Sequence, residues 1–233
     1  MKDLITLSDR IKMLCSSMIE EAIIANDELT LVVVPLHLLD LATQLRDHPD
    51  FRFEQLIDVC GVDYLQYGKA DWQTQSATES GFSRGVEEQS ESDVSPFSYR
   101  FAVVYHLLSL THNMRIRLRV PVHEDNKQLI IDSVNDIWSA ANWFEREAFD
   151  LYGILFRGHP DLRRILTDYG FAGHPFRKDF PLIGEVEVRY DAALERVVNE
   201  KVSIPDRVLE PKVIRHDHRY MLDEDKRQGE VLK

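Results

Sequence analysis

A short charged cluster, Glu145, Arg146, Glu147 and Asp150, contains the residue types of an acid–base site. General acid–base catalysis needs groups that reach the same substrate. On a helix, Glu145 and Glu147 lie about 200° apart and cannot converge, whereas Glu147 and Asp150 can. Arg146 and Asp150, at i and i+4, are placed to form an ion pair. We expect a structural or interface role for this cluster, with acid–base chemistry through Glu147 and Asp150 as the alternative.

Histidines suggest a second kind of chemistry, metal binding. His159 and His174 each stand in a Gly-His-Pro turn, and His216 and His218 form an H-x-H pair. No acid or third ligand stands at a spacing typical of a zinc site. We therefore expect His159 and His174 to bond nearby backbone, and we predict no metal site in this chain.

The two cysteines, Cys15 and Cys60, limit the redox chemistry further. An iron–sulfur cluster usually takes four thiolates, and these two are 45 residues apart without a C-x-x-C motif. They cannot form a disulfide framework, so a reducing compartment is favoured. The common glycine-rich phosphate loops are also missing from the sequence. We predict that the isolated chain holds no cluster, flavin or nucleotide.

Basic residues occur on two segments that suit protein contacts better than nucleic acid. Arg115, Arg117 and Arg119 alternate with apolar residues and would share one face of a strand, but that face lacks the stacking aromatics of an RNA-binding sheet. Later in the chain, basic and acidic residues alternate, which suits paired contacts across a protein interface. This later set includes Arg163, Arg164, Arg177, Lys178, Asp179 and Arg189.

Composition excludes several classes of protein. The 233 residues carry 28 basic and 40 acidic side chains, a net charge of −12, which counts against a general nucleic-acid binder or a protein that docks on anionic lipid. The longest apolar stretches, Leu29–Leu39 and Phe101–Leu110, are shorter than the roughly 20 residues of a membrane span. The beginning of the chain has no signal-peptide pattern. Any membrane association is expected to come only through a partner.

The first half of the chain predicts mixed α and β elements. Apolar residues at helical spacing predict a helix over 8–25. A buried strand over 29–34, a helix from Pro35 to His48 and a strand over 56–64 then form a β-α-β unit. The serine- and acid-rich stretch 69–95 has few core residues and is predicted to be a solvated insertion.

The middle of the chain gives the strongest pattern. A hairpin is predicted from strands over 99–110 and 114–122, the second with strict alternation of apolar and basic residues. A short strand near 129–131 and a helix over 139–152 follow. Trp143, two residues before Glu145, is expected to be buried on that helix.

Periodicity stops after Gly153. We predict one α/β domain over 1–153 and an extended, partner-binding C-terminal arm over 154–233, with strand-like pieces at 185–190 and 196–202. An arm with so little core can become ordered only against its own domain or a partner.

Three segments together resemble a known family. Residues 141–154 read ANWFEREAFDLYGI, residues 158–166 read GHPDLRRIL, and residues 173–182 read GHPFRKDFPL, with EVRYD at 187–191. The E-R-E-x-x-D pattern, with His159 and Arg163 at the family's spacing, closely resembles the 30 kDa subunit, also called the C subunit, of respiratory complex I. That enzyme is the proton-pumping NADH–quinone oxidoreductase.

The resemblance implies an α+β fold: a two-layer α/β sandwich with a mixed, largely antiparallel sheet, followed by an extended arm. It implies a peripheral-arm subunit that packs against the D subunit near the quinone site, and also near the B, I and G subunits, at the cytoplasmic side of a bacterial inner membrane. FMN and iron–sulfur clusters would sit in partner subunits, quinone would be the substrate of the complex, and this chain alone would be inactive.

The same resemblance marks a set of signature residues as an interface rather than a catalytic site. Two other functions stay open: the corresponding subunit of a membrane-bound hydrogenase, and a stand-alone enzyme that uses Glu147 and Asp150. The signature residues are Glu145, Arg146, Glu147, Asp150, His159, Arg163, Arg164, His174, Arg177, Lys178, Asp179 and Arg189.

Overall fold

A computed structural model of the chain describes residues 2–67, 72–74, 86–88, 97–125, 128–181, 184 and 186–202. Contacts divide the chain into two compact units, Met1–Pro181 and Leu182–Lys233. The sequence pattern placed the end of the α/β domain at Gly153, whereas the first unit continues to Pro181. The first unit extends further because the strand Ile154–Arg157 pairs with Gln128–Asp132 and contributes Ile154 and Phe156 to the core. Buried carboxylates then bind residues 164–167 and 178, for which the sequence gives no periodic signal.

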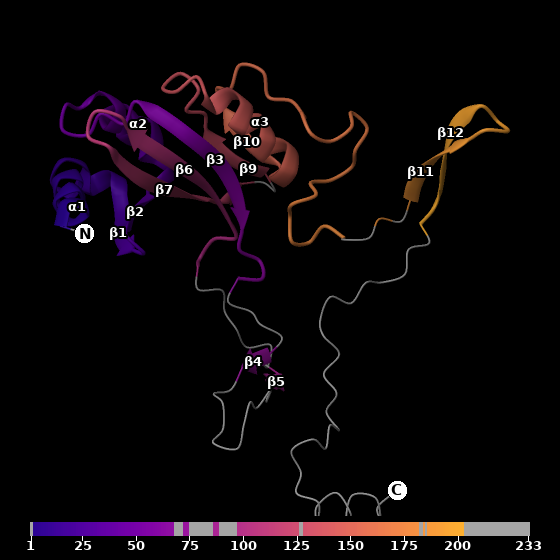
Figure 1. Ribbon diagram of the computed structural model, residues 1–233, viewed down its shortest axis with the longest axis horizontal. Coiled ribbons are helices and arrows are strands. Elements are labelled where there is room, and N and C mark those ends of the chain that lie inside the picture. Colours follow the sequence, from indigo (N-terminus) through magenta and orange to yellow (C-terminus); the bar gives the residue numbers. More distant parts are fainter. Residues whose placement is uncertain are drawn as a thin grey trace, which may run out of the picture. The chain divides into compact units, whose positions relative to one another are not determined.

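A five-stranded sheet forms the centre of the first unit (Figure 1). β2 and β7 pair in parallel and the other neighbours are antiparallel, which confirms the predicted mixed, largely antiparallel sheet. The order across the sheet is β1 (Ile19–Ala25), β2 (Glu28–Val33), β7 (Met114–Val122), β6 (Phe101–Ser109) and β3 (Gln55–Asp63).

Helices supply the second layer and share one core with the sheet. The α-helices of the described residues are α1 (Lys2–Cys15), α2 (Leu38–Asp47) and α3 (Ala141–Tyr152). Their buried side chains, such as Ile11, Leu41 and Ala148, belong to the same apolar cluster as Leu118 and Tyr105 of the strands. The two-layer arrangement is therefore confirmed.

The predicted helix over 8–25 is wrong in its second half. α1 ends at Cys15, and Ile19–Ala25 is strand β1, which pairs with β2. The turn between the strands consists of Asn26 and Asp27, with φ of 52° and 58°. A two-residue turn with positive φ at both positions suits the twist of a hairpin, and Asn and Asp tolerate that conformation. This turn and the apolar strand β2 that follows it favour a hairpin over 19–33, despite the helical spacing of apolar residues up to Ala22.

The expected β-α-β unit is present, but its two strands are not neighbours. β2 and β3 run parallel in the sheet and are separated by β7 and β6. A second, more compact β-α-β arrangement spans β9 (Gln128–Asp132), α3 and β10 (Ile154–Arg157), where β10 pairs with β9 in parallel. β8 (Glu124–Asp125) completes this small sheet. α3 is thus held at both ends by paired strands.

The hairpin of β6 and β7 agrees with its prediction. Ile116, Leu118 and Val120 are buried, and the arginines between them are exposed or half-buried. In the second unit, β11 (Val186–Asp191) and β12 (Arg196–Lys201) form an antiparallel hairpin close to the predicted strand-like pieces. Within the described ranges, no helix has both the length and the apolar character to cross a bilayer.

Most of the insertion 69–95 lies outside the described residues. Two short strands within it, β4 (Trp72–Thr74) and β5 (Val86–Glu88), pair with each other. At the ends of the insertion, aromatic rings pack together: Tyr64 and Phe97 have centroids 4.6 Å apart, and Phe97 and Tyr99 stack at 5.2 Å. The two ends of the insertion therefore meet in an aromatic cluster of the domain.

We expect that replacing residues 69–95 by a short Gly/Ser linker leaves the melting temperature unchanged or slightly higher. The aromatic cluster at the two ends stays intact, and each doubling of loop length costs only about 0.6 kcal/mol. Circular dichroism of the shortened and full-length chains measures this. A clearly lower melting temperature, or a shortened chain that folds but no longer binds its partners, would contradict the prediction.

Candidate functional site

The signature cluster lies on α3, whose end is specified by a glycine. Gly153 has a φ of 77°, and its N–H donates to the carbonyl oxygen of Phe149. A left-handed residue at this position commonly ends a helix and favours glycine. A Cβ here would also meet His174 Nε2 at 2.7 Å. His174 of the later Gly-His-Pro turn therefore packs against the end of α3 where only a glycine leaves room for it.

Glu145 is fully buried and binds the loop before its own helix. The Ser133 hydroxyl donates to Glu145 Oε2 at 2.6 Å, and the Val134 N–H donates to Oε1 at 2.8 Å. Burial raises the pKa of the Glu145 carboxyl from its ordinary 4.5 to about 7, although both hydrogen bonds act in the opposite direction. Glu145 thus fixes the connection between β9 and α3.

Asp150, also fully buried, holds the chain that follows β10. Its Oδ2 accepts the N–H groups of Ile165, Leu166 and Thr167 at 3.0, 2.7 and 2.9 Å, and Arg164 Nη1 donates to Oδ1 at 3.0 Å. Burial alone would raise the pKa of Asp150, but the Thr167 hydroxyl and the backbone donors outweigh it and hold the pKa well below its ordinary value. Asp150 is therefore an ionised anchor.

The two turn histidines bond backbone, as predicted, but mainly the backbone of α3 rather than that of their own turns. His159 Nε2 lies 3.1 Å from the Asn142 carbonyl oxygen, and His159 Nδ1 accepts the Asp161 N–H at 3.1 Å. His174 Nδ1 lies 2.9 Å from the Asp150 carbonyl oxygen. Both ring nitrogens of His159 are occupied, so this residue is not available to a metal. His216 and His218 lie outside the described residues.

A second anchor joins residues 177–179 to the sheet. The fully buried Asp63 carboxylate accepts Arg100 Nε at 3.0 Å and the Lys178 N–H at 2.8 Å. Arg100 also contacts Asp179 at 3.0 Å, and Arg177 contacts Asp179 at 3.2 Å. Hydrogen bonds from Arg177 and Arg100 lower the pKa of Asp179 to about 2. Arg177 and Asp179, expected to pair across an interface, therefore have partners within their own unit.

Sequence reasoning missed Asp63 and Arg100. Asp63 stands 115 residues before Lys178, so no local spacing connects them. Asp63 follows alternating apolar residues of β3 and lies at a buried position of that pattern. A carboxylate at such a position needs hydrogen-bond partners, and this is the only signal that could have drawn attention to it.

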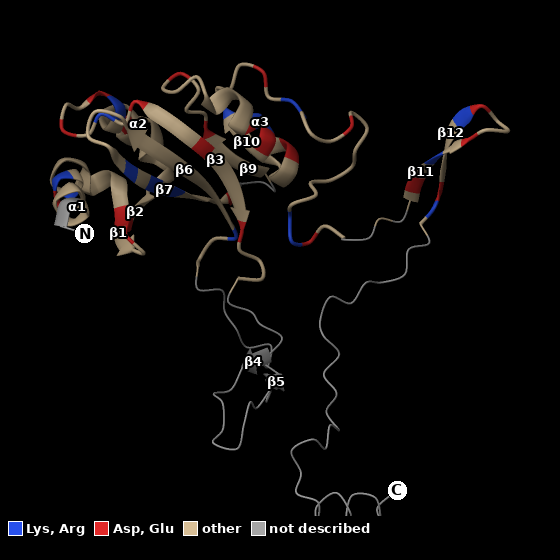
Figure 2. Ribbon diagram, viewed as in Figure 1, with Lys and Arg blue, Asp and Glu red and all other residues tan. Residues whose placement is uncertain are grey.

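Trp143 is exposed, and its expected burial is wrong. Its side chain is 61% accessible, because the buried face of α3 contains Ala141, Glu145 and Ala148 instead. Arg146 does not pair with Asp150: it lies 3.3 Å from Asp161, and Arg164 pairs with Asp150. In Figure 2, the ribbon of α3 and of the loop that follows β10 has both acidic (red) and basic (blue) positions.

The remaining signature residues lie at the surface. Glu147 and Lys178 are exposed, and Arg163 contacts Asp161 at 3.2 Å with a side chain that is 63% accessible. Arg189 belongs to the hairpin of the second unit and contacts Glu200 at 2.8 Å. The first unit thus contains all the signature residues except Arg189.

The geometry does not support an acid–base pair. Glu147 is exposed, while Asp150 is buried and its oxygens already accept hydrogen bonds from residues 164–167. A catalytic carboxyl must reach the proton that it transfers. Glu147 and Asp150 therefore cannot act together on one substrate.

Three further side chains are of residue types that can bind a metal ion. Asp58, Cys60 and His106 have ligand atoms within 4.8 Å of one another on β3 and β6. Arg117 Nε donates to His106 Nε2 at 3.1 Å, which places a cation beside the group. Burial raises the pKa of the Cys60 thiol to about 11, which disfavours the thiolate that would bind a metal. This group is not suited to a metal ion.

Comparison with known proteins places these features in a family context. The family model described as respiratory-chain NADH dehydrogenase, 30 Kd subunit, matches residues 31–186. The chain is 60% identical to the C subunit of NADH-quinone oxidoreductase from Coxiella burnetii over 216 residues, covering 92% of this chain and 94% of that protein. It is 58% identical to the protein of the same name from Legionella pneumophila (strain Corby) over 206 residues, covering 88% and 90%.

A solved structure shares the fold. A chain of the membrane-bound sulfane sulfur reductase, an archaeal respiratory membrane complex, superposes with a TM-score of 0.53 and 18% identity, covering 76% of this chain and 85% of that chain. At this identity the likeness concerns the fold alone.

Proposed function

Because the chain belongs to the family of the 30 kDa subunit of respiratory-chain NADH dehydrogenase, we propose that it is a structural subunit of complex I that carries no cofactor of its own. In this role it supports electron transfer from NADH to quinone through contacts with other subunits. The observation that carries the proposal is the 60% identity to the C subunit of an NADH-quinone oxidoreductase over 92% of the chain. FMN and the iron–sulfur clusters then belong to partner subunits.

The chemistry of the signature residues supports a structural role. Glu145, Asp150 and Asp63 are buried carboxylates that bind the chain's own backbone and side chains. Cys60 is half-buried with a raised pKa, and Cys15 donates to Gln44 at 2.9 Å. These groups maintain the fold, and the exposed signature residues are left for contacts with partners.

The second unit is proposed as the main attachment to the D subunit, near the quinone site. Val186, Val188, Tyr190 and Val197 of its hairpin are all at least 60% accessible. An isolated two-stranded hairpin is marginally stable in water. Packing of this apolar face on another subunit would stabilise it. The B, I and G subunits are proposed as further neighbours, and the chain would reach the cytoplasmic side of the inner membrane only as part of the complex.

Truncation after Pro181 tests this proposal. The truncated chain is expected to keep the melting temperature of the first unit but to be lost from the purified complex, together with NADH–quinone turnover. The full-length chain, expressed with an affinity tag, should co-purify with flavin- and cluster-bearing subunits and be colourless when isolated. A matched control is Asp50→Asn, which changes one exposed charge of the first unit outside the signature residues and should assemble normally.

Two outcomes would contradict the proposal. Normal incorporation of the truncated chain would show that the second unit is not the attachment. Stoichiometric iron or flavin in the isolated full-length chain, or turnover by that chain alone, would show that it is not a cofactor-free structural subunit.

A further inference from the structure

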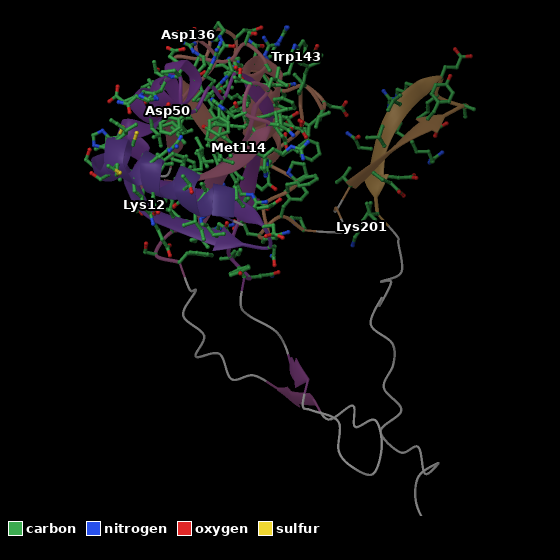
Figure 3. All side chains as sticks on the ribbon, turned by 60° about the vertical axis from the view of Figure 1, so that its left-hand side comes forward. Lys12, Asp50, Met114, Asp136, Trp143 and Lys201 are labelled. Carbon is green, nitrogen blue, oxygen red and sulfur yellow. The ribbon has the colours of Figure 1, made fainter. Side chains whose placement is uncertain are left out.

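One patch on the first unit combines an exposed tryptophan with two arginines. Trp143, labelled in Figure 3, is 61% accessible. The guanidinium of Arg146 lies 4.8 Å from the centre of the Trp143 ring. Asp161 contacts both Arg146 Nη2 at 3.3 Å and Arg163 Nε at 3.2 Å. We call these four residues, Trp143, Arg146, Asp161 and Arg163, the Trp143 patch.

The Trp143 patch is held rigidly by the fold. The side chain of Arg146, which contacts the Trp143 ring, is only 8% accessible, so it cannot move freely. The ring of His159 connects the Asn142 carbonyl oxygen to the Asp161 N–H, which ties the loop bearing Asp161 to the start of α3. Side chains that are already ordered lose less conformational entropy when they bind a partner.

The charges of the patch indicate the chemistry of that partner. Two guanidinium groups share a single carboxylate, so the patch has a net positive charge on a chain whose total is −12. Within the part of the chain that the structure describes, Arg146 Nε has no hydrogen-bond acceptor. Arg163 is 63% accessible and can donate to a second carboxylate in a charge-assisted contact.

The composition of the patch is that of an interface centre. Scattered exposed apolar residues are ordinary on a protein surface. Tryptophan and arginine, however, are the residue types most enriched among the side chains that dominate binding energy. A tryptophan fixed on a buried arginine presents a large apolar surface at low entropic cost, directly beside an exposed cation.

We propose that the Trp143 patch binds a segment of another subunit of the same complex, in which an apolar side chain covers Trp143 and an Asp or Glu carboxylate pairs with Arg163. This inference rests on the proposed function, since it requires the chain to be part of a multisubunit assembly. It adds a contact on the first unit to the attachment through the second unit.

Binding measurements on the full-length chain test the proposal. The probe is the purified complex assembled without this chain and immobilised on a surface. Trp143→Ala is expected to weaken binding about thirty-fold, the effect of a dominant interface residue. Trp143→Phe should recover part of the affinity. Arg163→Glu should weaken binding at low salt and reduce its salt dependence, because the carboxylate contact is lost.

The matched control is Leu36→Ala, which removes another exposed apolar side chain, 83% accessible, from the first unit. It should bind as the unaltered chain does. Each isolated variant should melt within about 2 °C of the unaltered chain, since Trp143 is not part of the core.

The outcomes separate this inference from the proposed function. If the unaltered chain does not bind the other subunits, the proposed function itself fails. If it binds and Trp143→Ala binds equally well, only the Trp143 patch is refuted. A large fall in the melting temperature of isolated Trp143→Ala would also overturn the inference, because Trp143 would then be supporting its own fold. Self-association lost in Trp143→Ala would identify a second copy as the occupant and overturn it as well.

Discussion

Replacing Asp150 by asparagine is expected to lower the free energy of unfolding by about 3–5 kcal/mol. The substitution leaves Arg164 without its buried counter-ion. If the amide oxygen takes the place of Oδ2 and accepts the N–H groups of residues 165–167, the amide NH₂ replaces Oδ1 and faces the Arg164 donor. Removing one member of a buried charged pair has a cost of this size. Thermal unfolding monitored by circular dichroism should show a melting temperature lower by about 10 °C.

Limited proteolysis tests the same substitution at the loop that Asp150 binds. Trypsin should cleave Asp150→Asn faster after Arg163 or Arg164, because the loop bound by Asp150 is released. The matched control is Glu147→Gln on the exposed side of α3, which should change stability by less than about 0.5 kcal/mol. Equal melting temperatures for both variants would show that the hydrogen bonds of Asp150 contribute nothing measurable.

Replacing Glu145 by glutamine is expected to stabilise the protein by about 3 kcal/mol at pH 8 and to have little effect near pH 5. Glutamine keeps the acceptor for the Val134 N–H, and its amide can donate to the Ser133 hydroxyl, which rotates to accept. The change removes a carboxylate that burial makes costly to ionise.

Proton linkage determines whether ionisation of Glu145 raises or lowers the stability of the protein. The pKa of Glu145 rises from 4.5 to about 7 on folding, so between these values the folded chain binds the proton more strongly than the unfolded chain. Stability of the unaltered protein therefore falls as pH rises from about 4.5 to 7. A difference of about 2.5 pKa units corresponds to about 3 kcal/mol above pH 7.

Urea unfolding at several pH values between 5 and 8 measures this effect. The unaltered chain and Glu147→Gln should lose stability in parallel as pH rises, whereas Glu145→Gln should lose less. If the Glu145→Gln curve runs parallel to the other two, the Glu145 carboxyl does not retain its proton in the folded state. Lower stability of Glu145→Gln at every pH would show that the charged form is needed by the loop at Ser133.

Both substitutions concern carboxylates of the charged cluster on α3, and both carboxylates serve the architecture of the domain. Asp150 is stabilised as an anion by donors from the chain after β10, while Glu145 is destabilised as an anion by burial. The same helix thus contains two carboxylates with opposite pKa shifts. Neither faces solvent, which is why the exposed Trp143 and Arg163 are better candidates for contact with a partner.

Family membership and much of the sheet follow from the amino-acid sequence alone. The alternation of apolar residues and arginines over 114–122 could only be satisfied by a strand with one buried face, and β7 has that form. The signature over 141–182 is long enough to identify the family without a structure, as the comparisons confirm. One histidine contact was also predictable, since His159 Nδ1 accepts the Asp161 N–H within its own turn, whereas the backbone partners of His159 Nε2 and His174 Nδ1 lie 17 and 24 residues away.

Only the tertiary structure shows which helix faces are buried and which charged side chains form pairs. Helical spacing groups Trp143 with Glu147 but does not say whether that side of α3 faces the sheet or solvent, because the choice depends on strands distant in sequence. The pairing of Asp63 with Lys178 and Arg100, and of Asp150 with residues 164–167, depends on chain segments that meet only after folding. A buried carboxylate needs hydrogen-bond donors, and the fold can supply them from any part of the chain. The spacing of residues in the sequence therefore does not predict which donors these are.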